Sequence, residues 1–270
     1  MPAKRAVPGR AAAAPKAARP AGLLLDIDGV ITVGGRALPG ALDAVRRVQE
    51  LKIPLKFVTN TTRRPRREVV RNLRRLGLTV ETGDVFTPAV LARNLLAREK
   101  LTPFPVIHPA LAEDFTGLGA SGAEAVVVGD AGPYFTYDLL NQAFRKLIHG
   151  ARFFALAKNR NFLDHDHELS LDAGPFVAAL EYASAKEATV LGKPSAEFFK
   201  LAVESMFCEP ARVAMIGDDA EADVGGAMAA GLQGILVRTG KYRPRQEESL
   251  SKPPTLIAGD LAAAVEMLFG

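Results

Sequence analysis

Residues 22–30, with the sequence GLLLDIDGV, decide the fold of this chain. A short apolar run ends in two aspartates and a glycine, which is typical of a buried parallel strand whose carboxyl end opens onto a site. Asp26 and Asp28 lie two residues apart, so their carboxylates project to the same side of an extended chain, and Gly29 permits a sharp turn after them. The stretch therefore predicts a strand that ends in a pair of cooperating carboxylates.

Strand and helix patterns alternate on both sides of a middle segment. Residues 40–51 have apolar side chains at helical spacing, residues 54–60 (PLKFVTN) are typical of a second buried strand, and residues 65–76 predict another helix. Further along, residues 212–218 (RVAMIGD) and 234–239 (GILVRT) predict two strands around a glycine-rich helix. This alternation indicates an α/β fold with a doubly wound, Rossmann-like parallel sheet.

The chain of 270 residues is long enough for a core and a smaller second domain. Between the two alternating halves lie shorter strand patterns and two helical stretches, which we interpret as an inserted α/β domain. We expect the core to comprise residues 22–100 and 185–270, the inserted domain to comprise 101–184, and residues 1–21 to form a disordered basic tail.

Composition narrows the class of protein. Hydrophobic residues make up 48% and charged residues 24%, and no apolar run approaches the ~20 residues of a membrane helix, so no membrane partner is expected. The formal net charge of the chain is +4. The first twenty residues hold five basic side chains and no acidic one, so residues 21–270 carry a net charge of −1. The lone Cys208 excludes an internal disulfide and fits a reducing compartment, so we expect a cytoplasmic protein.

Asp26 and Asp28 suit two roles in phosphoryl transfer. An aspartate nucleophile forms an acyl phosphate and divides one difficult displacement into two easier ones. A neighbouring acid protonates the leaving oxygen and then activates water as a base. We therefore expect Asp26 to be the nucleophile and Asp28 the acid and base.

Residues at the ends of other predicted strands could bind a metal cation and the phosphoryl oxygens of a substrate. A phosphate dianion near several carboxylates requires a metal ion to offset their charge, and oxygen ligands such as Asp218, Asp219 and Asp223 favour Mg²⁺. Thr59 and Asn60 end the second predicted strand and can donate hydrogen bonds to phosphoryl oxygens, while Lys193 supplies a positive charge. Because ligands of open α/β sheets bind at the carboxyl ends of strands, we expect these side chains to converge.

In this order the motifs DIDGV, VTNTT, GKP and IGDDAEAD resemble those of the haloacid dehalogenase-like hydrolase superfamily, in its capped type IIA subfamily. The resemblance implies that the inserted domain is a cap and that the cofactor is Mg²⁺, held by Asp26, the backbone carbonyl of Asp28, and Asp218. It also implies that Thr59, Asn60, Thr61 and Lys193 bind a small phosphorylated substrate. Asp219 and Asp223 would orient metal-bound water or Lys193 from behind, and the cap could shelter a homodimer interface.

Three alternatives remain open at this stage: a phosphotransferase, a regulatory module that binds phosphate and Mg²⁺ without turnover, and a nucleic-acid-associated protein. The arginines of residues 63–75 favour the last only weakly, because no aromatic side chains interleave with them, and we expect no specific nucleic-acid partner. Within that stretch Arg63 could steer the substrate, being close to Thr59. The loop 158–167, with His165 and His167, could set specificity from the cap.

Overall fold

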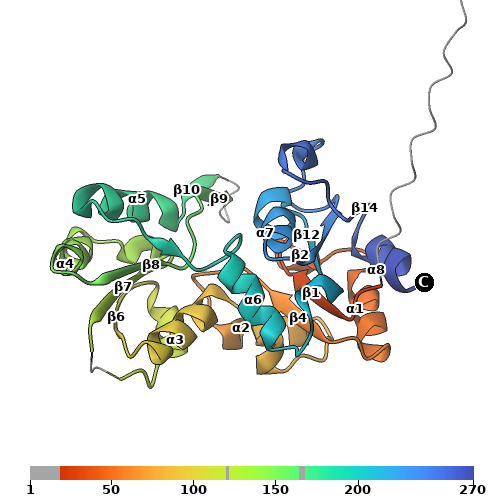
Figure 1. Cartoon of the computed structure of the whole chain (residues 1–270), viewed down its shortest axis with the longest axis horizontal. Helices are drawn as coiled ribbons and strands as arrows, with labels where there is room; N and C mark the ends of the chain where they lie inside the picture. Colours follow the sequence, from red (N-terminus) through yellow and green to blue (C-terminus); the bar gives the residue numbers. More distant parts are fainter. Residues whose placement is uncertain (1–18, 120–121, 164–167) are drawn as a thin grey trace, which may run out of the picture.

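The computed structural model describes residues 19–119, 122–163 and 168–270. Its larger unit, on the right in Figure 1, is built on a parallel sheet. The sheet has six strands in the order β14-β13-β12-β1-β4-β5. These strands are β1 (Gly22–Asp26), β4 (Leu55–Val58), β5 (Val85–Phe86), β12 (Val213–Gly217), β13 (Gln233–Val237) and β14 (Leu256–Ala258). The predicted doubly wound α/β fold is confirmed.

Helices cover both faces of this sheet because its strands are apolar on both sides. Leu23 and Leu25 of β1 pack with one set of helices and Leu24 with the other. The first set is α1 (Ala41–Glu50), α2 (Arg66–Arg75) and α8 (Leu261–Phe269), and the second is α3 (Pro88–Arg98), α6 (Ala196–Glu204) and α7 (Gly226–Ala229).

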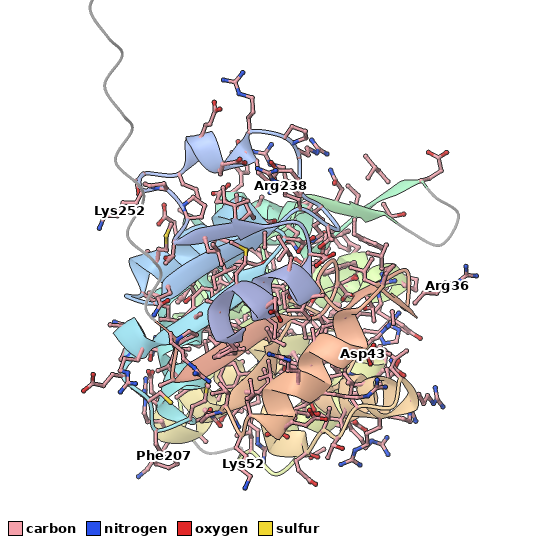
Figure 2. The ribbon with its side chains drawn as sticks, turned by 90° about the vertical axis from the view of Figure 1, so that its right-hand side faces the viewer. Arg36, Asp43, Lys52, Phe207, Arg238 and Lys252 are labelled. Carbon is pink, nitrogen blue, oxygen red and sulfur yellow. The ribbon has the colours of Figure 1, made fainter. Side chains whose placement is uncertain are left out.

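The helix α1 shows how the spacing of apolar residues in the sequence determines which side of a helix is buried. Ala41, Ala44, Val45 and Val48 are buried against the sheet, while Asp43 points to solvent on the face shown in Figure 2. Such a one-sided apolar stripe at 3.6-residue spacing forms when a helix lies on a core.

The smaller unit, the cap, is built on a parallel four-stranded sheet in the order β11-β8-β7-β6. Its strands are β6 (Thr102–Val106), β7 (Glu124–Val128), β8 (Arg152–Ala155) and β11 (Thr189–Val190), and it carries the helices α4 (Tyr137–Ile148) and α5 (Ala173–Ser184). It lies beside the larger unit, and α3 of that unit lies below the cap strands β6 and β7 in the view of Figure 1. Buried side chains of α3 and of β7 and β8 belong to one apolar cluster.

Short elements complete the fold. They are the hairpins β2 (Thr32–Val33) with β3 (Arg36–Ala37) and β9 (Asn161–Leu163) with β10 (Leu169–Leu171), and the 3-10 turns Thr82–Asp84, Pro109–Phe115, Gly132–Tyr134, Pro210–Arg212 and Gln246–Ser249. No helix among the described residues is long and apolar enough to cross a membrane.

Two boundaries differ from the expectation. Strand β11 pairs with β8 although it lies after residue 184, so we propose that the cap extends to Val190. Residues 1–18 of the expected tail lie outside the described residues; of its last residues, Pro20 is buried and the Ala21 amide donates to the Arg212 carbonyl at 2.6 Å. The final residues expected in the tail are therefore packed on the larger unit.

Candidate active site

A buried lysine joins two aspartates at the carboxyl edge of the six-stranded sheet. The Nζ atom of Lys193 lies 2.6 Å from Asp26 Oδ1 and 2.6 Å from Asp223 Oδ1. All three residues are at most 6% exposed. Asp26 ends β1, and Lys193 comes from the segment that follows the cap. The fold thus brings together three charged groups that are far apart in sequence.

Asp218 completes the cluster from the end of β12, the strand beside β1. Carboxylate oxygens of Asp26, Asp218 and Asp223 all lie within 4.8 Å of one another. The backbone amide of Lys241 donates to Asp218 Oδ2 at 2.6 Å. Gly29 is needed beside this carboxylate, because its φ is +96° and a Cβ there would lie 2.0 Å from Asp218 Oδ2.

Burial and mutual repulsion make these carboxylates weaker acids. Desolvation by burial raises the pKa of Asp26 to about 6, with Lys193 opposing the rise and Asp218 adding to it. Desolvation also raises the pKa values of Asp218 and Asp223 to about 6. For Lys193, burial alone would lower the pKa, but the charges of Asp223 and Asp26 outweigh it and the pKa is raised. The lysine is therefore an ammonium at neutral pH.

The donor set fits a divalent cation. Three buried carboxylates in mutual contact distance share the single charge of Lys193, which leaves an excess of negative charge in a desolvated site. Clustered carboxylate oxygens are the ligands that Mg²⁺ prefers. Asp26 and Asp218 could hold such an ion, because Asp26 contacts Lys193 only through Oδ1 and Asp218 accepts the Lys241 amide only through Oδ2. Asp223 is less available, because its Oδ1 pairs with Lys193 and its Oδ2 accepts from the Asp219 amide.

Asp28 lies at the exposed side of this cluster. Its side chain is exposed, and Thr32 Oγ1 approaches its Oδ1 at 3.4 Å. The amide of Gly29 donates to the Thr32 carbonyl at 2.6 Å, which closes the turn after the two aspartates. Solvent and an approaching ligand can therefore reach the carboxylate of Asp28.

The polar residues that follow β4 make two kinds of contact: Thr59 bonds within its own loop, and Asn60 bonds the backbone of Lys193. Thr59 is buried, one residue beyond Val58, the β4 residue that pairs with Asp26, and its Oγ1 accepts from the Thr61 amide at 3.2 Å. The side-chain amide of Asn60 bonds the backbone of Lys193 in both directions. The predicted phosphate contacts of Thr59, Asn60 and Thr61 stay a prediction.

The last predicted residue, Asp219, begins an irregular turn. Its Oδ1 accepts from the amides of Glu221 and Ala222 at 3.0 and 2.9 Å, so it caps the π-helical turn Ala220–Gly225. This turn replaces the start of the helix expected there. It directs Asp223 inward, and Asp223 Oδ2 accepts from the Asp219 amide at 3.2 Å.

Sequence reasoning missed the contacts between the larger unit and the cap. Arg63 forms a two-point ion pair with Asp130, at 2.8 Å to Oδ2 and 3.1 Å to Oδ1, and lies over the Phe162 ring at 5.2 Å. The Thr62 hydroxyl accepts from the Asp130 amide at 3.0 Å. No local motif marks Asp130. Of the loop 158–167, residues 164–167 and therefore the histidine pair lie outside the described residues.

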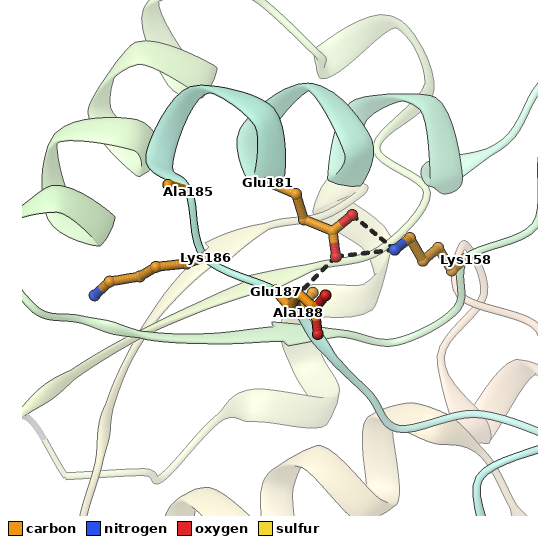
Figure 3. Close-up of a pocket in the computed structure, with 6 residues that line it drawn as sticks. All are labelled: Lys158, Glu181, Ala185, Lys186, Glu187 and Ala188. Atoms are coloured by element: carbon orange, nitrogen blue, oxygen red, sulfur yellow. Dashed lines mark hydrogen bonds and ion pairs between the residues drawn. The ribbon is translucent and has the colours of Figure 1, made fainter.

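A cavity of about 480 Å³ on the cap contains none of the candidate active-site residues. It is lined by Lys158, Glu181 and residues 185–188. Lys158 Nζ bonds both carboxylate oxygens of Glu181, at 2.9 and 2.7 Å, and the Ala188 amide donates to Glu181 (Figure 3). These contacts hold the segment after α5 in place, and both carboxylate oxygens of Glu181 have hydrogen-bond partners.

Comparison with known proteins agrees with this geometry. Two family models match: "haloacid dehalogenase-like hydrolase" over residues 23–121 and "HAD-hydrolase-like" over residues 190–264. The human haloacid dehalogenase-like hydrolase domain-containing protein 2 is 41% identical over 90% of this chain and 94% of its own length. The zebrafish phospholysine phosphohistidine inorganic pyrophosphate phosphatase is 40% identical over 92% and 93%.

Solved structures show the same fold at lower identity. A p-nitrophenyl phosphatase from Archaeoglobus fulgidus superposes with a TM-score of 0.84 at 26% identity, covering 92% of this chain and 98% of its own. The glycerol phosphate phosphatase of Mycobacterium tuberculosis, in complex with magnesium, has a TM-score of 0.80 at 28% identity, covering 91% and 76%. The chain therefore belongs to the haloacid dehalogenase-like hydrolase family.

Proposed function

We propose that this protein is a Mg²⁺-dependent phosphatase that hydrolyses a small phosphorylated compound through a phosphoryl group carried on Asp26. The observation that carries the proposal is the contact of Asp26 with a buried ammonium, Lys193, inside a cluster of carboxylates at the sheet edge. Such a site can accept a phosphate dianion once its own negative charge is offset. The phosphatase names of the relatives point to the same reaction.

In the first step an Asp26 carboxylate oxygen attacks phosphorus, and the bond from phosphorus to the leaving oxygen breaks. Asp28 gives its proton to that oxygen. In the second step Asp28 takes a proton from water, whose oxygen attacks phosphorus, and the bond from phosphorus to Asp26 breaks. Inorganic phosphate leaves, and Asp26 returns as a carboxylate.

Positive charge and hydrogen-bond donors stabilise the phosphoryl group during both steps. Lys193 is buried and protonated, so it offers a fixed charge without solvent reorganisation. Mg²⁺ held by Asp26, Asp218 and the Asp28 carbonyl would supply Lewis-acid stabilisation of the phosphoryl oxygens. Thr59 and Thr61 would donate to the phosphoryl oxygens from the loop after β4.

The substrate must fit between the larger unit and the cap. The phosphoryl group would lie on the cluster and the rest of the molecule would face the cap, whose Asp130 and Phe162 contact Arg63 at the junction. A reducing, cytoplasmic setting fits the lone Cys208.

Phosphate release from a panel of phosphomonoesters, pyrophosphate and phosphoramidates tests the proposal. The panel is run with Mg²⁺ or with EDTA, for the wild type and for Asp26→Asn, which keeps the shape of the side chain but removes the nucleophile. We expect turnover only by the wild type with Mg²⁺. Added alcohol acceptors separate hydrolysis from phosphotransfer, because transfer consumes substrate without releasing phosphate. A folded wild type that turns over none of the panel would favour a binding module.

A further inference from the structure

Asn60 holds the backbone of Lys193 with both atoms of its side-chain amide. Its Nδ2 donates to the Lys193 carbonyl at 2.8 Å, and its Oδ1 accepts from the Lys193 amide at 2.8 Å. The paired bonds fix both the position and the orientation of one peptide segment. We call this contact between Asn60 and Lys193 the amide clasp.

The chain around Lys193 is shaped to receive the clasp. A Cβ atom at Gly192 would lie 2.7 Å from Asn60 Oδ1 and 2.5 Å from the Leu156 carbonyl oxygen. Glycine therefore lets the backbone approach Asn60 closely. Gly192 and Lys193 are buried and the two hydrogen bonds are partly buried, which limits the competition of water for them.

The clasp lies at the junction between cap and larger unit. The Leu191 amide donates to the Ala155 carbonyl of the cap strand β8 at 2.8 Å, so the cap sheet reaches to within two residues of Lys193. Beyond the clasp the side chain of Lys193 runs to Asp26 and Asp223. A movement of the cap would act on Lys193 through this short segment unless the segment were anchored to the larger unit.

We propose that Asn60 is a positioning residue that anchors Lys193 to the loop after β4, so that the ammonium keeps its place beside Asp26 when the cap moves. This role rests on the proposed function. It differs from the phosphate contact expected for Asn60 from sequence, because both amide atoms already have partners on Lys193.

A double-mutant cycle tests the proposal with an activated aryl phosphate, which keeps slow variants measurable. We expect Asn60→Ala to lower kcat about 100-fold with little change in KM, since misplacement of a catalytic group by about 1 Å has that effect. In a Lys193→Met background, which keeps side-chain length without charge, Asn60→Ala should cost less than about threefold, because no ammonium remains to be positioned. Equal losses in both backgrounds, or a rise in KM alone, would overturn the proposal.

A second measurement does not depend on turnover. Acetic anhydride acylates neutral amines, and mass spectrometry compares the labelling of Lys193 with that of exposed Lys200 on α6. Asn60→Ala should raise the relative labelling of Lys193 about tenfold or more, because a segment that Asn60 no longer holds opens more often and exposes the amine of a residue that is now only 6% exposed. Unchanged labelling would refute the clasp even in an inactive protein. Faster labelling in a protein without phosphatase activity would retain the clasp and reject the proposed function.

Discussion

Gly217 ends β12 directly before Asp218, and a methyl group there would test the site through space alone. A Cβ atom at this position would lie 2.2 Å from the Cβ of Asp223 and 2.4 Å from its Oδ2. Ordinary contact begins near 3.4 Å, so Asp223 must retreat by about 1.2 Å. The partner oxygen of Lys193 moves with it, which changes an ion pair now 2.6 Å long.

For Gly217→Ala we expect two effects. Overpacking should lower the free energy of unfolding by about 1–3 kcal/mol. Displacement of Asp223 and Lys193 should lower kcat about 100-fold. Thermal unfolding and steady-state kinetics at a temperature well below Tm measure the two effects separately.

Two matched variants separate stability from activity. Gly83→Ala adds a methyl group where nothing lies within 4 Å, and should change neither quantity. Gly22→Ala crowds the flexible end of Met206, at 2.7 Å, at the opposite end of β1 from Asp26, and should lower Tm while sparing kcat. A Gly217→Ala protein with wild-type kcat would refute the inference that the ion pair between Asp223 and Lys193 is needed for turnover.

Three further predictions concern pH, the proton donor and the cap. In the metal-free protein the pKa values of Asp26 and Asp218 are raised from 3.8 to about 6. Between pH 3.8 and about pH 6 the folded state therefore binds more protons than the unfolded state. The free energy of unfolding should fall as pH rises through this range and level off above it. Mg²⁺ competes with those protons, so its increase of Tm should grow from about pH 5 to about pH 7, and a pH-independent increase would contradict the ligand assignment. Asp28→Asn should lower kcat about 100-fold for alkyl phosphates and much less for p-nitrophenyl phosphate, whose leaving group needs little protonation; equal losses for both esters would argue against an acid role. Arg63→Ala, which breaks the contact with Asp130, should lower kcat and raise KM together through poorer cap closure, whereas a change confined to low ionic strength would indicate steering instead.

The fold and the main cluster could be predicted because both follow from strand ends. In the sequence, polar residues directly follow the apolar run of each predicted strand. Parallel strands bring their carboxyl ends to one edge of the sheet. Asp26 and Asp218 therefore meet, although β1 and β12 are far apart in sequence. Asp223 was expected to orient water or Lys193, and the structure pairs it with Lys193.

The contacts that hold the cluster could not be read in this way. The bonds of Asn60 to the Lys193 backbone and of the Lys241 amide to Asp218 involve backbone atoms, which every residue possesses, so no side-chain pattern reveals them. The pair of Arg63 with Asp130 depends on how the cap rests on the larger unit. Strand β11 has two residues, too few to show a period, and it is defined by its pairing with β8.

Chemical trapping of the phosphorylated enzyme tests the central claim most directly. Borohydride reduces an aspartyl phosphate to homoserine, so a reaction stopped during turnover can be reduced, digested and read by mass spectrometry. We predict homoserine at position 26 in the wild type with substrate and Mg²⁺, and none with EDTA or in Asp26→Asn. Homoserine at another aspartate, or continued turnover with no trapped residue at position 26, would contradict the account.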